Sequence, residues 1–182
     1  LIDAMSIGAA EGLKLALNVG GMLLAFIAVI AAVNYGLSGL IGEYTGLNAW
    51  VANTTGGQFT GFSLEYIFGQ IFRGFAFAIG VDWLDTLQVG SLLGQKTVIN
   101  EFVAYLSLSE MKEAGSLSPK SIVIATYALC GFSNFSSIAI QLGGISIIAP
   151  NQQGNLSRLG LKSLMAASLA CLMTATIAGM LF

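Results

Sequence analysis

Two short polar motifs hold the side chains of this sequence that are best suited to binding a small hydroxylated molecule. Residues 94–101 read Gly-Gln-Lys-Thr-Val-Ile-Asn-Glu, and residues 131–137 read Gly-Phe-Ser-Asn-Phe-Ser-Ser. The carboxylate of Glu101 offers two acceptor oxygens, which match the adjacent hydroxyls of a vicinal diol such as ribose. Asn134 and Ser137 lie three residues apart, so they share one face if a helix begins there. Their hydrogen-bonding groups also suit sugar hydroxyls.

Other residues of the two motifs admit more than one role. Lys96 lies five residues before Glu101 and is the alternative partner of that acid, in an ion pair. Phe132 either contacts an apolar ring face of the ligand or packs in the protein core. Gln95 and Asn100 lie in the first motif beside Lys96 and Glu101. The candidate substrate-binding residues are Glu101, Asn134, Ser137, Phe132, Gln95 and Asn100.

The composition of the chain is that of an integral membrane protein. Of its 182 residues, 55% are hydrophobic and 9% are charged, compared with about 25% charged residues in soluble proteins. Its seven lysines and arginines are scattered and form no basic stripe of the kind that nucleic-acid binding needs. The sequence has no histidine, no Gly-x-Ser-x-Gly motif and no paired-acid protease motif, so we do not expect an enzyme.

A broken helix is predicted around the second motif. No charged residue occurs between Lys120 and Arg158, yet the apolar stretch 121–149 is interrupted at residues 131–137. Polar groups at this membrane depth are costly unless they face a protein interior or a ligand. A break also frees backbone N–H and C=O groups, which can replace the water that a polar solute sheds.

A re-entrant hairpin is predicted around the first motif. Residues 86–95 and 102–108 are apolar, but at about 1.5 Å per residue neither can cross a hydrocarbon core of about 30 Å. Two half-length helices joined by a polar tip enter and leave the membrane on the same side. Such backbone is tolerated at depth only where it is buried in protein or lines a cavity.

The remaining segments complete an all-α polytopic membrane protein. Spanning helices are predicted at residues 15–33 and 159–182, an interfacial amphipathic helix at 64–81, and polar connections at 42–62, 110–120 and 151–157. An excess of basic residues marks cytoplasmic loops. The side chains of Lys14, Arg158 and Lys162 are therefore expected on the cytoplasmic side, with the 42–62 connection outside.

Several isolated residues have expected structural roles. Asp82 or Asp85 is expected to cap the helix that follows. Asn34, like Asn18, is expected to form hydrogen bonds between helices. The two cysteines, Cys130 and Cys171, are expected to be buried packing thiols.

A polar hairpin tip and a polar break, both at membrane depth, are typical of secondary transporters that bind their substrate near the midplane. A channel is the alternative, since hairpins and polar filters also occur there. A single buried acid with nearby amides suits the capture of a neutral solute. Ion conduction would instead call for a ring of charges.

The sequence resembles the concentrative nucleoside transporter family over nearly its whole length. The matching stretches are 13–27, 96–105 and 127–140, and the specific motifs are Asn-Glu-Phe-Val-Ala-Tyr and Gly-Phe-x-Asn-Phe-Ser-Ser. Ser133 stands where the family usually has alanine, which is a small departure. The resemblance implies a nucleoside symporter coupled to Na⁺ or H⁺, with no cofactor. The alternative is a channel or a transporter for another small polar solute.

The resemblance also implies an architecture and a set of partners. Residues 1–62 resemble part of the scaffold domain, which forms a homotrimer, and residues 63–182 resemble the second of two inverted repeats in a mobile transport domain. The first repeat, which in the family reads the base and holds most of the coupling-ion site, is absent. We therefore expect a piece of a longer protein of a bacterial inner (plasma) membrane, whose metal ligands and base preference are unknown.

The resemblance assigns roles to four of the candidate residues. It implies that Glu101, Asn134 and Ser137 bind the ribose of a nucleoside. It places Phe132 beside that site.

Overall fold

A computed structural model describes residues 2–182, and every regular element in that range is helical. The predicted all-helical class is therefore confirmed. The helices are α1 (Ile2–Asn34), α2 (Glu43–Thr45), α3 (Leu47–Thr54), α4 (Leu64–Ala78), α5 (Thr86–Val98), α6 (Glu101–Glu113), α7 (Pro119–Leu129), α8 (Phe135–Ile148) and α9 (Gln153–Leu181), with a π-helical stretch at Tyr35–Gly42 and a 3-10 turn at Pro150–Gln152.

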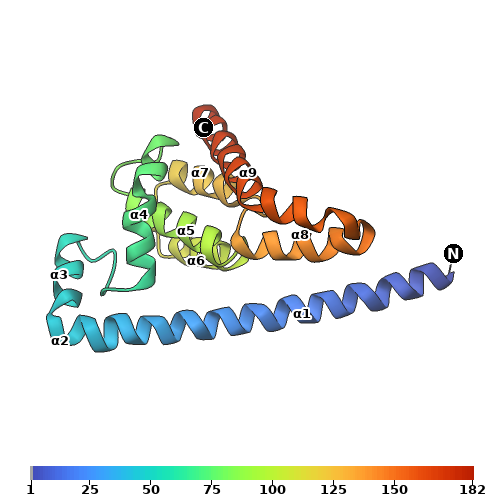
Figure 1. Cartoon of the computed structure of the whole chain (residues 1–182). Helices are drawn as coiled ribbons and strands as arrows, with labels where there is room; N and C mark the ends of the chain where they lie inside the picture. Colours follow the sequence, from blue (N-terminus) through green and yellow to red (C-terminus); the bar gives the residue numbers. More distant parts are fainter. Residues whose placement is uncertain (1) are drawn as a thin grey trace.

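In Figure 1, α1 is a long rod that leads through α2 and α3 to α4, beyond which α5 to α9 gather together. Asn34, at the end of α1, ties this rod to the start of α4. Its Nδ2 donates to both carboxylate oxygens of Glu65, at 3.0 and 2.9 Å, and its Oδ1 accepts from the backbone N of Leu64 at 2.8 Å. The interhelical hydrogen bonds predicted for Asn34 are confirmed, whereas the side chain of Asn18 lies outside the described residues.

Within the described part of the chain, two helical segments are long and apolar enough to cross a membrane, Ile27–Thr45 and Gln153–Leu181. The second covers nearly all of the span predicted at 159–182. The first only partly overlaps the span predicted at 15–33, because the helical path continues through the π-helical stretch Tyr35–Gly42.

The helices are interrupted at both polar motifs, where the sequence predicts interruptions. Only Ile99 and Asn100 separate α5 from α6, and the two helices lie side by side. Residues 130–134 separate α7 from α8. With 11 and 14 residues, α7 and α8 are each shorter than the roughly 20 residues that a transmembrane helix needs.

Two of the predicted polar connections are partly helical. The 42–62 connection contains α2 and α3, and α3 buries Val51 against Phe59 and Tyr66. The predicted 110–120 connection is shorter than expected, because α6 continues to Glu113 and α7 already begins at Pro119. Short helices with a single buried side chain lack the long apolar stripe that predicts a helix from sequence.

Asp85 occupies the predicted N-cap position of α5, but its side chain does not cap that helix. Its Oδ2 instead accepts a hydrogen bond from the backbone N of Ser118 at 3.0 Å, and Asp82 Oδ2 accepts one from Ser118 Oγ at 3.2 Å. The predicted capping bond is therefore wrong. Both acids instead connect the start of α5 to the residue that caps α7.

Helices α4 and α5 cross closely at a seam of three glycines, Gly69, Gly90 and Gly94. A Cβ atom added to Gly69 would lie 2.7 Å from the carbonyl oxygen of Leu87, and one added to Gly90 would lie 2.7 Å from the carbonyl oxygen of Gly69. A Cβ on Gly94 would overlap the side chain of Phe68. Small residues let two backbones approach in this way. The seam holds α5 against α4.

We predict that Gly90→Ala lowers the stability of the protein by about 1–3 kcal/mol, because the new methyl group meets backbone atoms that cannot move aside. Gly74→Ala is the matched control, since an added Cβ at Gly74 has no neighbour within 4 Å. The control should be neutral or gain up to about 1 kcal/mol, because alanine favours a helix. Thermal unfolding in detergent measures both, and equal midpoints for the two variants would contradict the seam.

Candidate functional site

The candidate site lies where the N-termini of α6 and α8 meet. Asn100 precedes α6, and its Oδ1 accepts a hydrogen bond from the backbone N of Val103 at 3.0 Å. Asn134 precedes α8, and its Oδ1 accepts one from the backbone N of Ser137 at 2.8 Å. Each cap satisfies an N–H group that a helix leaves unpaired at its start. Both asparagines of the sequence motifs are therefore helix caps.

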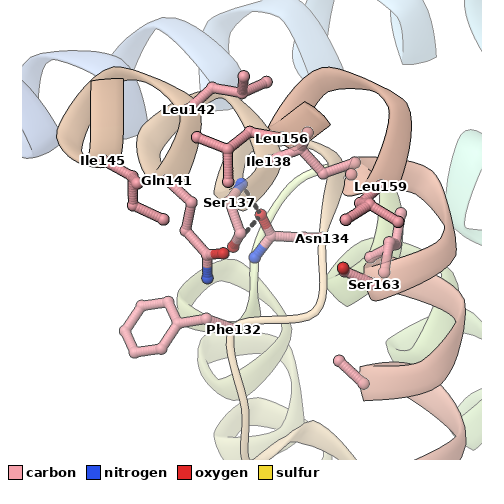
Figure 2. Close-up of a pocket in the computed structure, with 13 residues that line it drawn as sticks. Phe132, Asn134, Ser137, Ile138, Gln141, Leu142, Ile145, Leu156, Leu159 and Ser163 are labelled. Atoms are coloured by element: carbon pink, nitrogen blue, oxygen red, sulfur yellow. Dashed lines mark hydrogen bonds between the residues drawn. The ribbon is translucent and has the colours of Figure 1, made fainter. Parts of the chain in front are cut away.

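Asn134 also joins the two helix starts through its amide nitrogen. Its Nδ2 donates to Glu101 Oε2 at 2.7 Å. Its Oδ1 additionally accepts hydrogen bonds from Ser136 Oγ at 2.7 Å and from Ser137 Oγ at 2.8 Å, and Figure 2 shows the bonds to Ser137. Only one orientation of the amide serves all of these partners. Asn134 is 1% exposed, so this network is buried.

The structure thus brings Glu101, Asn134 and Ser137 together from two segments that lie more than thirty residues apart. Glu101 stands in the first turn of α6. A helix N-terminus carries partial positive charge, which interacts favourably with a nearby carboxylate. Among the described residues, Glu101 Oε1 accepts no side-chain hydrogen bond, and Asn134 Nδ2 donates only one of its two. These groups are suited to a neutral ligand that carries hydroxyls.

The opposite end of the break, the C-terminus of α7, takes its partners from three other helices. Lys96 Nζ on α5 donates to the carbonyl oxygen of Ala128 at 2.8 Å. Tyr105 on α6 donates through its hydroxyl to the carbonyl oxygen of Thr126 at 2.7 Å. Cys171 Sγ on α9 donates to the carbonyl oxygen of Cys130 at 3.4 Å. These bonds satisfy carbonyl groups that the end of a helix leaves unpaired.

Gly131 allows the chain to leave α7 within this crowded space. Its φ of +150° is one that side-chain-bearing residues rarely adopt, and a Cβ there would lie 2.8 Å from Cys171 Sγ. Both cysteines are free thiols, and Cys130 is exposed while Cys171 is half-buried. The prediction that both are buried in packed helices is therefore wrong, because Cys130 lies at the break itself.

Two sequence-based expectations about the hairpin change. Lys96 is 3% exposed and donates to the carbonyl oxygen of Ala128. Within the described residues, no ion pair joins Lys96 to Glu101. The alternative of a Lys96–Glu101 ion pair is therefore wrong. The structure does not bring Gln95 to the cluster either, since its Nε2 donates to Ser91 Oγ at 3.2 Å and its Oε1 accepts from Ser107 Oγ at 2.8 Å. Its buried amide joins α5 to α6.

A cavity of about 190 Å³ opens beside the cluster, between α8 and α9. Asn134 and Ser137 contribute to its wall, together with Phe132, whose side chain is 75% exposed. The alternative that Phe132 packs in the protein core is therefore wrong. Among the described residues, no three His, Cys, Asp or Glu side chains gather as a metal site.

Gln141 is a polar residue of this cavity that the motifs do not include. It lies on α8, four residues after Ser137, and lines the same wall. The signal in the sequence is a single amide within the otherwise apolar run Ile-Ala-Ile-Gln-Leu at residues 138–142. Spacing alone could have found it, because residues four apart share one face of a helix.

Comparison with known proteins shows that the chain is similar to transporters. A family model described as the C-terminus of Na⁺-dependent nucleoside transporters matches residues 1–179. The chain is 48% identical over 99% of its length to an uncharacterized transporter of Bacillus subtilis, YutK, of which it covers 41%. It is 44% identical over 98% of its length to the putative nucleoside permease NupX of Escherichia coli, of which it covers 40%.

A solved structure of similar fold extends the comparison. The transporter CNTnw, in an inward-facing substrate-bound state, matches with a TM-score of 0.85 and 42% identity, over 98% of this chain and 40% of that one. The human solute carrier family 28 member 3 is 37% identical over 100% of the chain, which covers 26% of that relative. The chain thus spans about two fifths of its bacterial relatives.

We predict that Lys96→Met destabilises the protein by about 1–3 kcal/mol, because the carbonyl oxygen of Ala128 loses its charged partner at the break. Methionine keeps most of the length of the side chain, so packing changes little. Lys112→Met is the control, since Lys112 is an exposed lysine in the last turn of α6. Thermal unfolding in detergent compares the two, and an equal midpoint would rule out a structural role for the Lys96 ammonium.

Proposed function

Because the chain belongs to the family of Na⁺-dependent nucleoside transporters, we propose that it forms the ribose-binding part of a cation-coupled nucleoside symporter. Members of this family are membrane proteins and not enzymes. The proposal extends nucleoside transport to this chain from its relatives, which include the putative nucleoside permease NupX and CNTnw, whose structure is in a substrate-bound state. It rests on one observation above all, the 2.7 Å hydrogen bond between Asn134 Nδ2 and Glu101 Oε2.

This bond supports a ribose site in which both helix starts contact the same sugar. The Glu101 carboxylate accepts hydrogen bonds from the two adjacent hydroxyls of the ribose, O2′ and O3′. Asn134 Nδ2 donates its second hydrogen to a sugar oxygen, and Ser137 Oγ accepts from a sugar hydroxyl. The exposed ring of Phe132 packs against an apolar face of the ligand. Asn100 holds the start of α6, and with it Glu101, in place.

The proposed membrane arrangement follows from the lengths of the helices. We propose that α5 and α6 form a re-entrant hairpin and that α7 and α8 form one broken helix, because none of the four can cross a bilayer alone. Residues 63–182 then belong to a transport domain and residues 1–62 to a scaffold that forms a homotrimer. The whole protein lies in the plasma (inner) membrane and uses Na⁺ or H⁺ as the coupling ion.

The proposed mechanism moves the transport domain against the scaffold. Structures of the similar transporter CNTnw are described in inward-facing and outward-facing states, which supports such a movement. A channel for a small polar solute remains the second candidate, because a polar tip can also line a pore. The Glu101 carboxylate paired with the Asn134 amide favours the symporter, since these groups suit a neutral solute rather than the passage of ions.

We predict that Glu101→Gln weakens nucleoside binding by about 10- to 150-fold, because each hydrogen bond to a charged group contributes about 1.5–3 kcal/mol. Glutamine keeps the shape of the side chain and removes the charge and one acceptor. Glu110→Gln, an exposed acid on the same helix, is the control and should bind as the unchanged protein does. Equilibrium binding to the whole purified protein measures both variants, and wild-type affinity in Glu101→Gln would contradict the ribose site.

The same site predicts discrimination between sugars. Nucleosides that lack the 2′ or the 3′ hydroxyl should compete for uptake about 10-fold less well than the ribonucleoside, since each loses a hydrogen bond to a carboxylate. Competition of the deoxy analogues against a labelled ribonucleoside measures this. Equal competition by both analogues would show that Glu101 does not hold the diol.

Coupling to an ion separates the symporter from the channel. In vesicles that contain the whole protein, uptake should saturate with nucleoside concentration and should accumulate substrate when an inward Na⁺ or H⁺ gradient is imposed. Imposing the two gradients separately identifies the ion. Non-saturating uptake that no gradient drives uphill would favour the channel.

A further inference from the structure

Gln141 lines the cavity, and its amide takes no part in the proposed ribose contacts. It lies one helical turn after Ser137 on α8 and lines the cavity together with Phe132, Asn134 and Ser137. In Figure 2 its amide group lies beside Ser137 and on the same side of the cavity as Phe132. No hydrogen bond links it to the other residues drawn there. Gln141 is exposed, so the amide is open to a ligand.

Gln141 is a polar side chain within an apolar stretch of α8. The neighbouring residues of the cavity wall, Ile138, Leu142 and Ile145, are apolar. In the proposed membrane arrangement α8 lies at membrane depth, where polar side chains mark functional sites. A molecule that enters the cavity is the partner that this geometry provides.

We propose that Gln141 is a specificity-determining residue that hydrogen-bonds the part of the nucleoside beyond the ribose diol. This inference rests on the proposed function. Helical side chains lean toward the helix N-terminus, which directs the Gln141 amide toward Ser137 and Asn134. With the diol held at Glu101, the rest of the nucleoside extends along α8 and meets this amide.

The chemistry of the amide limits what Gln141 recognises. An amide both donates and accepts, so it suits a neutral group with the same capacity. A nucleoside offers two such groups beyond its diol, the 5′ hydroxyl of the sugar and the hydrogen-bonding edge of the base. The exposed ring of Phe132 beside the amide gives the flat base a surface to pack on.

The test compares Gln141→Met with Gln153→Met in the whole purified protein. Methionine matches glutamine in length and favours a helix, but it forms no comparable hydrogen bond. Gln153 is an exposed glutamine in the first turn of α9 and does not line the cavity. Equilibrium binding of a ribonucleoside and of its 5′-deoxy analogue is measured for both variants and for the unchanged protein.

The expected result is a loss of ribonucleoside affinity of about 2- to 10-fold in Gln141→Met, which corresponds to one neutral hydrogen bond, and none in Gln153→Met. If the loss disappears with the 5′-deoxy analogue, the partner is the 5′ hydroxyl. If the loss persists with that analogue, the partner is the base. Equal affinities of Gln141→Met and Gln153→Met for both ligands overturn the inference.

Failure of this inference and failure of the proposed function give different results. If Glu101→Gln loses binding while Gln141→Met keeps it, the ribose site stands and only the role of Gln141 fails. If Glu101→Gln binds like the unchanged protein, or if the unchanged protein binds no nucleoside, the proposed function fails and the role of Gln141 fails with it.

Discussion

The break at residues 130–134 imposes the constraint on which the rest of this structure depends. An interruption between two helices leaves carbonyl groups unpaired on one side and N–H groups unpaired on the other, and an apolar environment offers them no water. The carbonyl end takes its partners from Lys96, Tyr105 and Cys171, which lie on three different helices. The N–H end takes its cap from Asn134. The packing of α5, α6 and α9 around α7 therefore satisfies one side of this interruption.

The same constraint joins stability to ligand recognition. Asn134 caps α8 with its oxygen and holds Glu101 with its nitrogen, so one side chain both ends the interruption and shapes the proposed sugar site. Glu101 in turn stands directly after Asn100, the cap of α6. The groups proposed to contact the ligand are therefore fixed by the bonds that hold the helices, which is the arrangement that a precise site needs.

The sequence predicts those features that depend on local chemistry. The interruptions, the helix that starts after Asn134, and the hydrogen bonds of Asn34 follow from isolated polar residues in apolar sequence. Features that depend on a distant neighbour could not be predicted in the same way. Asp85 stands at a helix start but bonds to Ser118, thirty-three residues away, and Gln95 lies beside the tip but points into the contact with α6. Only the folded chain shows which partner each side chain meets.

The glycine seam between α4 and α5 has a mechanical consequence. At this seam the two backbones lie so close that a Cβ added to Gly69 or Gly90 would meet backbone atoms of the other helix. The link from α5 to α6 is two residues long. The acid at the start of α6 is therefore linked to α4 through the close packing of α5. Any displacement of that acid relative to α1 has to be absorbed at the joint between Asn34 and Glu65, which three hydrogen bonds to one side chain hold together.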